Sequence, residues 1–167
     1  YVTRDIEQAK QWIKSKAKGT QRYGLTASSG AKRLRRYGIW VQNKINAPVW
    51  FLNNKEDVRS SFYLEETATE FDIQGLELDW TVVCWDGNLR FNGNNFEYYC
   101  FTGTKWNNVR KEEQILYLKN SYRVLLTRAR QGFVIFIPNG DKNDKTMLPD
   151  YYDGIYNYLK EIGIAEI

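Results

Sequence analysis

Trp80-Thr81-Val82-Val83-Cys84-Trp85 lies near the middle of the chain, and a second apolar run, Phe133-Val134-Ile135-Phe136-Ile137, follows further on. Neither run alternates regularly between polar and apolar residues, as a strand with one face in water would. Short continuous apolar runs that are rich in β-branched and aromatic residues are typical of strands buried on both faces. The two runs therefore predict a mainly parallel sheet that is covered by helices on both sides.

The segments around these runs predict alternating helices and strands. Helices are expected over residues 3–18, 31–37, 111–130 and 151–162, and further short strands over residues 22–27 and 62–67. Between residues 86 and 110, Asp86-Gly87-Asn88 and Asn92-Gly93-Asn94 are hairpin signals, which predict a β-ribbon insertion. No repeat or linker divides the chain, so we expect one α/β domain over residues 1–167.

Composition narrows the possible chemistry. The chain has 167 residues, a net charge of +4 and no histidine. The lack of histidine excludes a histidine general base, a Ser-His or Cys-His nucleophile pair and the common zinc sites, and we expect no metal ligands in this chain. A mildly basic chain is compatible with nucleic acid without requiring it. The two cysteines are not expected to form a disulfide, because the chain otherwise looks cytosolic.

The sequence also gives expectations about where the protein is located and whether it is part of a longer chain. No apolar run approaches the ~20 residues needed to span a bilayer, so we expect a cytoplasmic protein with no membrane partner. The only methionine is Met147, which favours a piece of a longer protein.

Two motifs flank the apolar runs. Thr69-Glu70-Phe71-Asp72-Ile73-Gln74-Gly75-Leu76-Glu77-Leu78-Asp79 precedes the first run, and Tyr122-Arg123-Val124-Leu125-Leu126-Thr127-Arg128-Ala129-Arg130 precedes the second. Polar groups at the ends of buried strands are typical of ligand sites in open α/β sheets. The motif pair resembles the last two motifs of superfamily 1 helicases, QG-x-E and LTRAR. The motif sequences are most similar to those of the Schlafen-type DNA/RNA helicase-like P-loop proteins.

This resemblance implies a RecA-like fold and a role as the second of two motor lobes that clamp ATP between them. The sequence G-x-x-x-x-G-K-[ST], which cradles phosphates, does not occur in the chain. The resemblance assigns that P-loop and the Mg²⁺-binding acids to an N-terminal RecA-like lobe of the same protein. ATP and Mg²⁺ would therefore be held mainly by that partner lobe, and this chain alone is expected to be inactive.

The resemblance also assigns roles to residues around the nucleotide. Arg128 matches the arginine finger, whose guanidinium stabilises charge on the transferring phosphate. The alternative is that Arg128 caps the C-terminal end of helix 111–130. Gln74, Gly75 and Glu77 match QG-x-E and are expected at the ATP. The alternative is that these residues form only a simple turn before a strand. Arg130 is expected either at a phosphate or at the helix end.

Nucleic-acid contacts are expected elsewhere in the chain. Thr69 aligns with a threonine that meets the nucleic-acid backbone in relatives, and Phe71 stands where relatives often have histidine and could stack on a base. The turn after residues 22–27 and the basic helix that follows combine hydroxyls with cations, which suits phosphate. The candidates in this segment are Ser28, Ser29, Lys32 and Arg33. The alternative is a solvated helix face, and the aromatic ribbon could equally pack on its own lobe.

The sequence therefore predicts the C-terminal motor lobe of an ATP-dependent DNA/RNA helicase or translocase, with single-stranded DNA or RNA as a partner. The alternatives are a nucleic-acid-binding module or a protein-interaction module that keeps the fold without motor activity.

Overall fold

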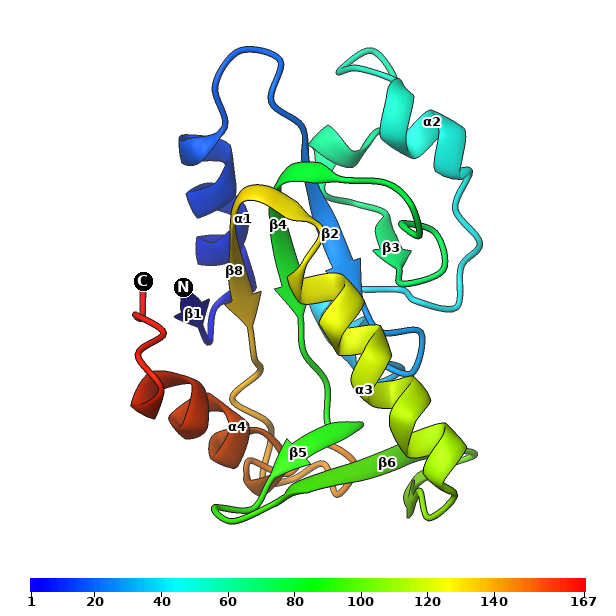
Figure 1. Ribbon diagram of the computed structural model, residues 1–167, viewed down its shortest axis with the longest axis vertical. Coiled ribbons are helices and arrows are strands. Elements are labelled where there is room, and N and C mark those ends of the chain that lie inside the picture. The colour runs from blue at the N-terminus through cyan, green and yellow to red at the C-terminus, as the bar shows by residue number, and fades with distance from the viewer.

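The computed structural model describes residues 1–167 and contains a five-stranded, all-parallel sheet in the order β1-β8-β4-β2-β3 (Figure 1). The strands are β1 (Val2–Thr3), β2 (Tyr23–Ala27), β3 (Thr67–Thr69), β4 (Leu78–Cys84) and β8 (Ala129–Phe136). The two apolar runs form the centre of the sheet, where β4 pairs with both β2 and β8. The α/β prediction with a mainly parallel sheet is confirmed.

Helices cover both faces of the sheet, as predicted. They are α1 (Ile6–Lys16), α2 (Ala47–Leu52), α3 (Glu112–Leu126) and α4 (Asp150–Glu161), with short 3-10 turns at Leu34–Tyr37 and Ser61–Tyr63. Alternate residues of each strand face opposite sides. Val82 therefore joins the core beneath α1, while the neighbouring Val83 joins the core shared by α2, α3 and α4.

The predicted ribbon forms a three-stranded antiparallel sheet in the order β5-β6-β7 (Leu89–Phe91, Phe96–Thr102 and Lys105–Asn108). It lies at one end of the molecule, beside α4 (Figure 1). The buried Arg90 fixes it there, because its guanidinium carbon lies 3.5 Å from the ring centre of Tyr151 in α4 and 3.9 Å from that of Tyr99 in β6.

Several predicted elements differ from the structure. Residues 31–37 form turns that end in a 3-10 segment, because tertiary contacts hold this stretch against the ribbon and the loop after β8. Residues 62–66 do not form the predicted strand; the strand in this region is β3, which starts at Thr67, the last residue of that prediction, and pairs with β2. Helix α3 stops at Leu126, since β8 begins at Ala129 to pair with Leu78. The short helix α2 was not predicted.

At the outer edge of the sheet, β1 was also not predicted, because Val2 fits the apolar spacing of the following helix. Val2 pairs with Ile135 of β8, and on its other side its N–H donates to the Ala165 carbonyl at 2.9 Å.

Because all five strands run in one direction, the sheet has an amino edge, where the strands begin, and a carboxyl edge, where they end. Helix α3 connects the two edges, since it starts near the ribbon and ends at the turn into β8 (Figure 1). None of the helices has the length and apolar character that crossing a bilayer would require.

Candidate functional sites at the two edges of the sheet

The two helicase-like motifs meet at the amino edge. Gln74, Gly75 and Glu77 precede β4, and Arg128 and Arg130 lie at the start of β8. The Leu78 N–H donates to the Arg128 carbonyl at 3.0 Å, which brings together Glu77 and Arg128, the residues that directly precede the adjacent strands β4 and β8. The general rule that α/β sheets bind ligands at their carboxyl ends does not apply to this cluster.

Arg128 makes no hydrogen bond or ion pair with another side chain of the protein. It lies one residue beyond Thr127, which is the C-terminal cap of α3, and it forms no ion pair. The Arg128 side chain is half-buried, and its Nε is buried without a hydrogen-bond partner. A buried guanidinium N–H without a partner costs free energy, and no ion pair or hydrogen bond within the chain holds the rest of this half-buried side chain.

The rest of this cluster is exposed. Gly75 has a φ of +81°, a conformation that glycine adopts without strain, and it gives the bend between Gln74 and Glu77 its shape. The Glu77 carboxylate lies 3.6 Å from Arg130 Nε, and both side chains are more than half exposed. Such a pair contributes little to stability, so Glu77 and Arg130 are available to other partners.

A second group of polar residues lies at the carboxyl edge, around the turn that follows β2. The buried Glu70, directly after β3, accepts three hydrogen bonds there. The Ser29 N–H donates to its Oε2 at 2.7 Å, and the Ser29 and Tyr117 hydroxyls both donate to its Oε1 at 2.7 Å. Burial, together with the Glu70 carboxylate, raises the pKa of Tyr117 to about 12.

Beneath this turn, a largely buried hydrogen-bond network fixes the backbone. The Tyr122 hydroxyl donates to Asn88 Oδ1 at 2.6 Å, and Asn88 Nδ2 donates to Ser28 Oγ at 3.1 Å. Asp86 accepts from the Arg33 N–H at 2.9 Å and from the Tyr152 hydroxyl at 3.0 Å, while burial raises the pKa of the Asp86 carboxyl. The network holds the turn after β2 rigidly against α3, α4 and the chain after β4.

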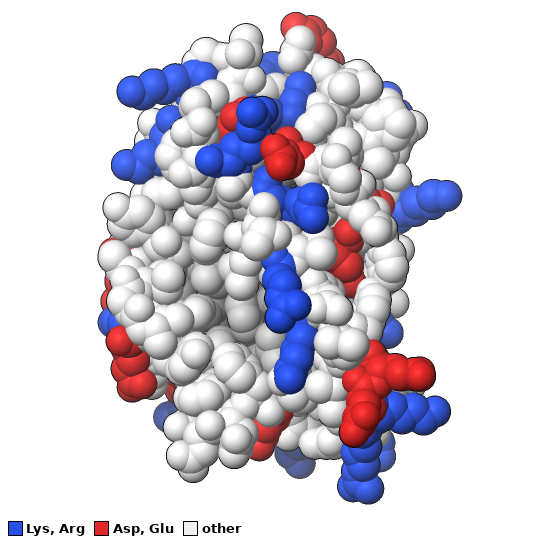
Figure 2. All heavy atoms as spheres, viewed as in Figure 1, with Lys and Arg blue, Asp and Glu red and all other residues white.

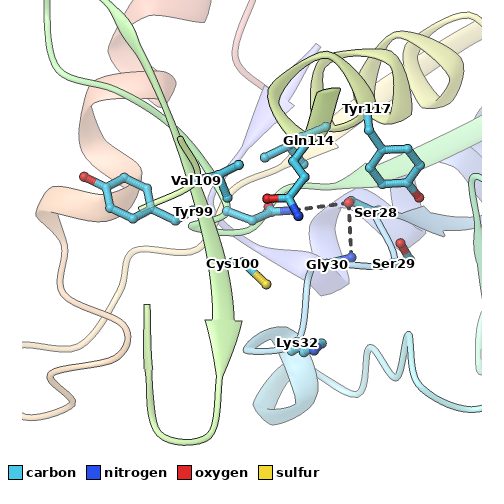
Figure 3. Close-up of a pocket in the computed structure, with 11 residues that line it drawn as sticks. Ser28, Ser29, Gly30, Lys32, Tyr99, Cys100, Val109, Gln114 and Tyr117 are labelled. Atoms are coloured by element: carbon cyan, nitrogen blue, oxygen red, sulfur yellow. Dashed lines mark hydrogen bonds between the residues drawn. The ribbon is translucent and has the colours of Figure 1, made fainter. Parts of the chain in front are cut away.

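A cavity of about 320 Å³ opens above this network, between the turn, β6 and α3 (Figure 3). Ser29 and the Tyr117 hydroxyl lie side by side at one end of it, and Lys32 and Cys100 line it from the turn and from β6. The cavity combines apolar walls with a few polar groups, as small ligand sites do.

The predicted nucleic-acid residues differ in accessibility. Ser29 and Lys32 line the cavity, and Phe71 is 62% exposed. In contrast, Ser28 and Thr69 are buried, and the Thr69 hydroxyl donates to Asp72 at 2.7 Å.

Arg33 is also engaged internally. Its guanidinium lies 3.0 Å from the Asp144 carboxylate, and its backbone N–H is bonded to Asp86. Arg33 therefore connects the turn to the loop after β8, and only some of the predicted set faces solvent.

Two residues of the carboxyl edge were missed from the sequence. Glu70 lies between the predicted Thr69 and Phe71, and a strand prediction ending at Thr69 would have placed it at the carboxyl edge. Tyr117 stacks on Phe71 with ring centres 6.0 Å apart, but its position on an exposed part of α3 gave no signal.

Charge on the molecule is not evenly spread. Lys and Arg side chains run down the middle of the face on which α3 lies (Figure 2), and the exposed Lys119 and Arg123 of α3 contribute cations to the molecular surface. The acidic residues of α3, Glu112 and Glu113, are in its first turn, where they interact favourably with the helix dipole.

No group of three carboxylates or cysteines could hold a metal ion.

Comparisons with known proteins agree with the motif pair. No curated protein and no solved structure gives a significant match to the chain. A family model, described as Schlafen group 3, DNA/RNA helicase domain, matches residues 1–139, which include both motifs and the complete parallel sheet. The chain therefore belongs to the Schlafen group 3 DNA/RNA helicase domain family.

Proposed function

We propose that this chain acts as the second motor lobe of an ATP-dependent DNA/RNA helicase or translocase. The observation that carries the proposal is the position of Arg128 beside Glu77 at the amino edge, with a buried Nε that has no partner in its own lobe. Such a guanidinium is suited to complete a nucleotide site whose other wall is an N-terminal RecA-like lobe.

In this proposal, Arg128 donates to the γ-phosphate oxygens as charge develops on them. Its planar fork of N–H groups matches phosphate geometry better than a lysine ammonium would. Glu77 and Gln74 are exposed next to it and would contact the ribose or help to order the partner lobe. ATP and Mg²⁺ would be bound chiefly by the partner lobe, since this chain has neither a P-loop sequence nor a carboxylate cluster.

The carboxyl edge would form part of the single-strand track. Ser29, Lys32 and Phe71 combine a hydroxyl, a cation and an exposed ring, which are groups that bind backbone phosphates and stack on bases. The two proposed sites lie at opposite ends of α3, whose 15 residues span about 22 Å. Strand binding and nucleotide binding would thus use separate surfaces of one rigid lobe.

The test is strand-stimulated ATP hydrolysis by the full-length protein. R128A and R128K are expected to lower the turnover number by about three to five powers of ten, as arginine-finger losses do elsewhere. The matched control is K14A, which removes an exposed cation from α1, on the opposite face of the sheet from α3, and should leave turnover unchanged. Normal turnover by R128A, or ATP hydrolysis by the 167-residue chain alone above that of its R128A variant, would contradict the proposal.

Strand binding by the chain itself separates the alternatives. Titration of a labelled single strand should give binding at low salt that weakens as salt rises. Binding without any effect of R128A on the full-length ATPase would favour a nucleic-acid-binding module. No binding at low salt would favour a protein-interaction module.

A further inference from the structure

The carboxylate of Glu70 is held in an unusual way for a buried charge. Glu70 is 7% exposed and forms no ion pair with any lysine or arginine. Its only hydrogen-bond donors are the Ser29 N–H, the Ser29 hydroxyl and the Tyr117 hydroxyl, all at 2.7 Å. Its three hydrogen bonds offset part of the cost of burying a carboxylate, but no cation offsets the rest, which is recovered when the carboxylate returns to water.

The three donors form an anion-binding site in their own right. One backbone N–H binds one oxygen of the carboxylate and two hydroxyls bind the other, and none of the donors belongs to the segment that carries Glu70. Backbone N–H groups and hydroxyls in a turn are the groups that bind phosphate oxygens in proteins. The turn lies directly after β2, at the carboxyl edge, where α/β sheets hold their ligands.

We propose that the Glu70 carboxylate occupies the position of a backbone phosphate of single-stranded nucleic acid, and that it leaves this position when a strand binds. This inference rests on the proposed function, because it assigns a gate to the single-strand track. In the free protein, the Glu70 carboxylate occupies the donor site. A strand must displace Glu70, so the free protein binds strands more weakly than the donor site alone would.

The surroundings favour a nucleic-acid strand as the competitor. Phe71, the next residue, is exposed and stacks on Tyr117, so a ring suited to a base lies beside the donor site. Lys32 lines the adjoining cavity, where its ammonium can attract a second phosphate (Figure 3). A phosphate at Ser29 and Tyr117 would therefore have a base platform on one side and a cation on the other.

The test compares strand affinities of the 167-residue chain and its variants by fluorescence anisotropy. E70Q keeps the shape of the side chain but removes its charge, and it is expected to bind a labelled single strand roughly three- to ten-fold more tightly. The control E65Q removes the same charge from an exposed residue that precedes β3, whereas Glu70 follows it, and should change affinity little. Adding S29A to E70Q should abolish the gain, because the donor site itself is then damaged.

Several outcomes would overturn the inference. E70Q could bind the strand as weakly as the wild type or more weakly, as expected if Glu70 only braces the turn against α3. E65Q could show the same gain, or S29A could leave the gain intact, and either result would mean that only net charge matters.

If E70Q folds poorly in a thermal melt, E70D replaces it. This variant keeps the charge but withdraws the carboxylate from its donors, so a smaller gain in affinity is expected. Unchanged or weaker binding by E70D would overturn the inference.

The outcomes also distinguish this inference from the proposed function. Strand binding by the wild type without a gain in E70Q overturns the role of Glu70 alone. No binding by the wild type or by E70Q overturns the strand track and the gate together. Normal ATPase activity of R128A in the full-length protein, combined with a gain in E70Q, would leave the gate standing on a lobe without an arginine finger.

Discussion

The glycine in the middle of α4 offers a sharp test of how the ribbon is attached. A Cβ added to Gly154 would lie only 1.8 Å from the carbonyl oxygen of Phe91, the last residue of β5. The nearest atom is backbone, which no side-chain rotation can move. Ordinary contact begins at 3.4 Å, so β5 would have to retreat from α4 by about 1.6 Å in G154A.

Two effects of this substitution have opposite signs. Alanine in a helix is favoured over glycine by about 1 kcal/mol, which would stabilise the protein at an open site. Overpacking typically costs about 1–3 kcal/mol, and the retreat of β5 would also disturb Phe91 against Tyr158, whose ring centres are 4.4 Å apart. Because the clash is with backbone, we expect the packing penalty to exceed the helix gain, with a net loss of up to about 2 kcal/mol.

Chemical denaturation and thermal melting of the chain measure this loss, which corresponds to roughly 2–4 °C in melting temperature per kcal/mol. The matched control is N157A, an exposed position of the same helix, where better helix propensity alone should stabilise by about half a kcal/mol. A G154A variant that melts at or above the wild-type temperature would refute the close approach of β5 to α4.

Two further predictions concern a thiol and a phenol. Cys100 is exposed at the cavity, whereas Cys84 is buried and burial raises the pKa of its thiol, so a thiol reagent should modify one cysteine in the native chain and both after unfolding. C100S should abolish the native reaction, and a fast second thiol in the native chain would contradict the burial of β4. For Tyr117, folding raises the pKa from its ordinary value near 10 to about 12, so its contribution to stability is complete below pH 10 and is lost as the pH rises through 12. The difference in unfolding free energy between wild type and Y117F should therefore shrink over that interval, and a difference that grows with pH would show that the Tyr117 proton is not held by Glu70.

The parts of the fold that could be predicted from the sequence are those with a local signal. The runs that became β4 and β8 are apolar throughout because both of their faces are buried, and Asn92-Gly93-Asn94 marked the hairpin between β5 and β6. The other hairpin signal, Asp86-Gly87-Asn88, was wrong, because it connects β4 to β5, which lie in different sheets and do not pair. The two-residue β1 could not be predicted, because Val2 is a strand residue only through its pairing with β8. The helix predicted over residues 31–37 failed for a similar reason, since the ribbon and a distant aspartate hold Lys32 and Arg33.

The candidate sites likewise differ in whether a local sequence signal predicts them. The amino-edge residues are adjacent in two short motifs, so their pairing followed from the order of the motifs, and the structure places Glu77 beside Arg128. The contacts of Glu70 depend on a turn 41 residues away in sequence and on a tyrosine 47 residues away. Nothing local in the chain signals such contacts, and only the arrangement of β2, β3 and α3 brings them together.

The outermost strands of the parallel sheet have a consequence for the behaviour of the protein at high concentration. An unpaired strand edge is a template on which another molecule can add a strand and begin to aggregate. Here one border is only the three residues of β3, and beyond the two-residue β1 the Val2 N–H and carbonyl are bonded to Ala165 and Ile167. Because so little backbone is left open at the borders of the parallel sheet, we expect no strand addition there, and light scattering at rising concentration would reveal any.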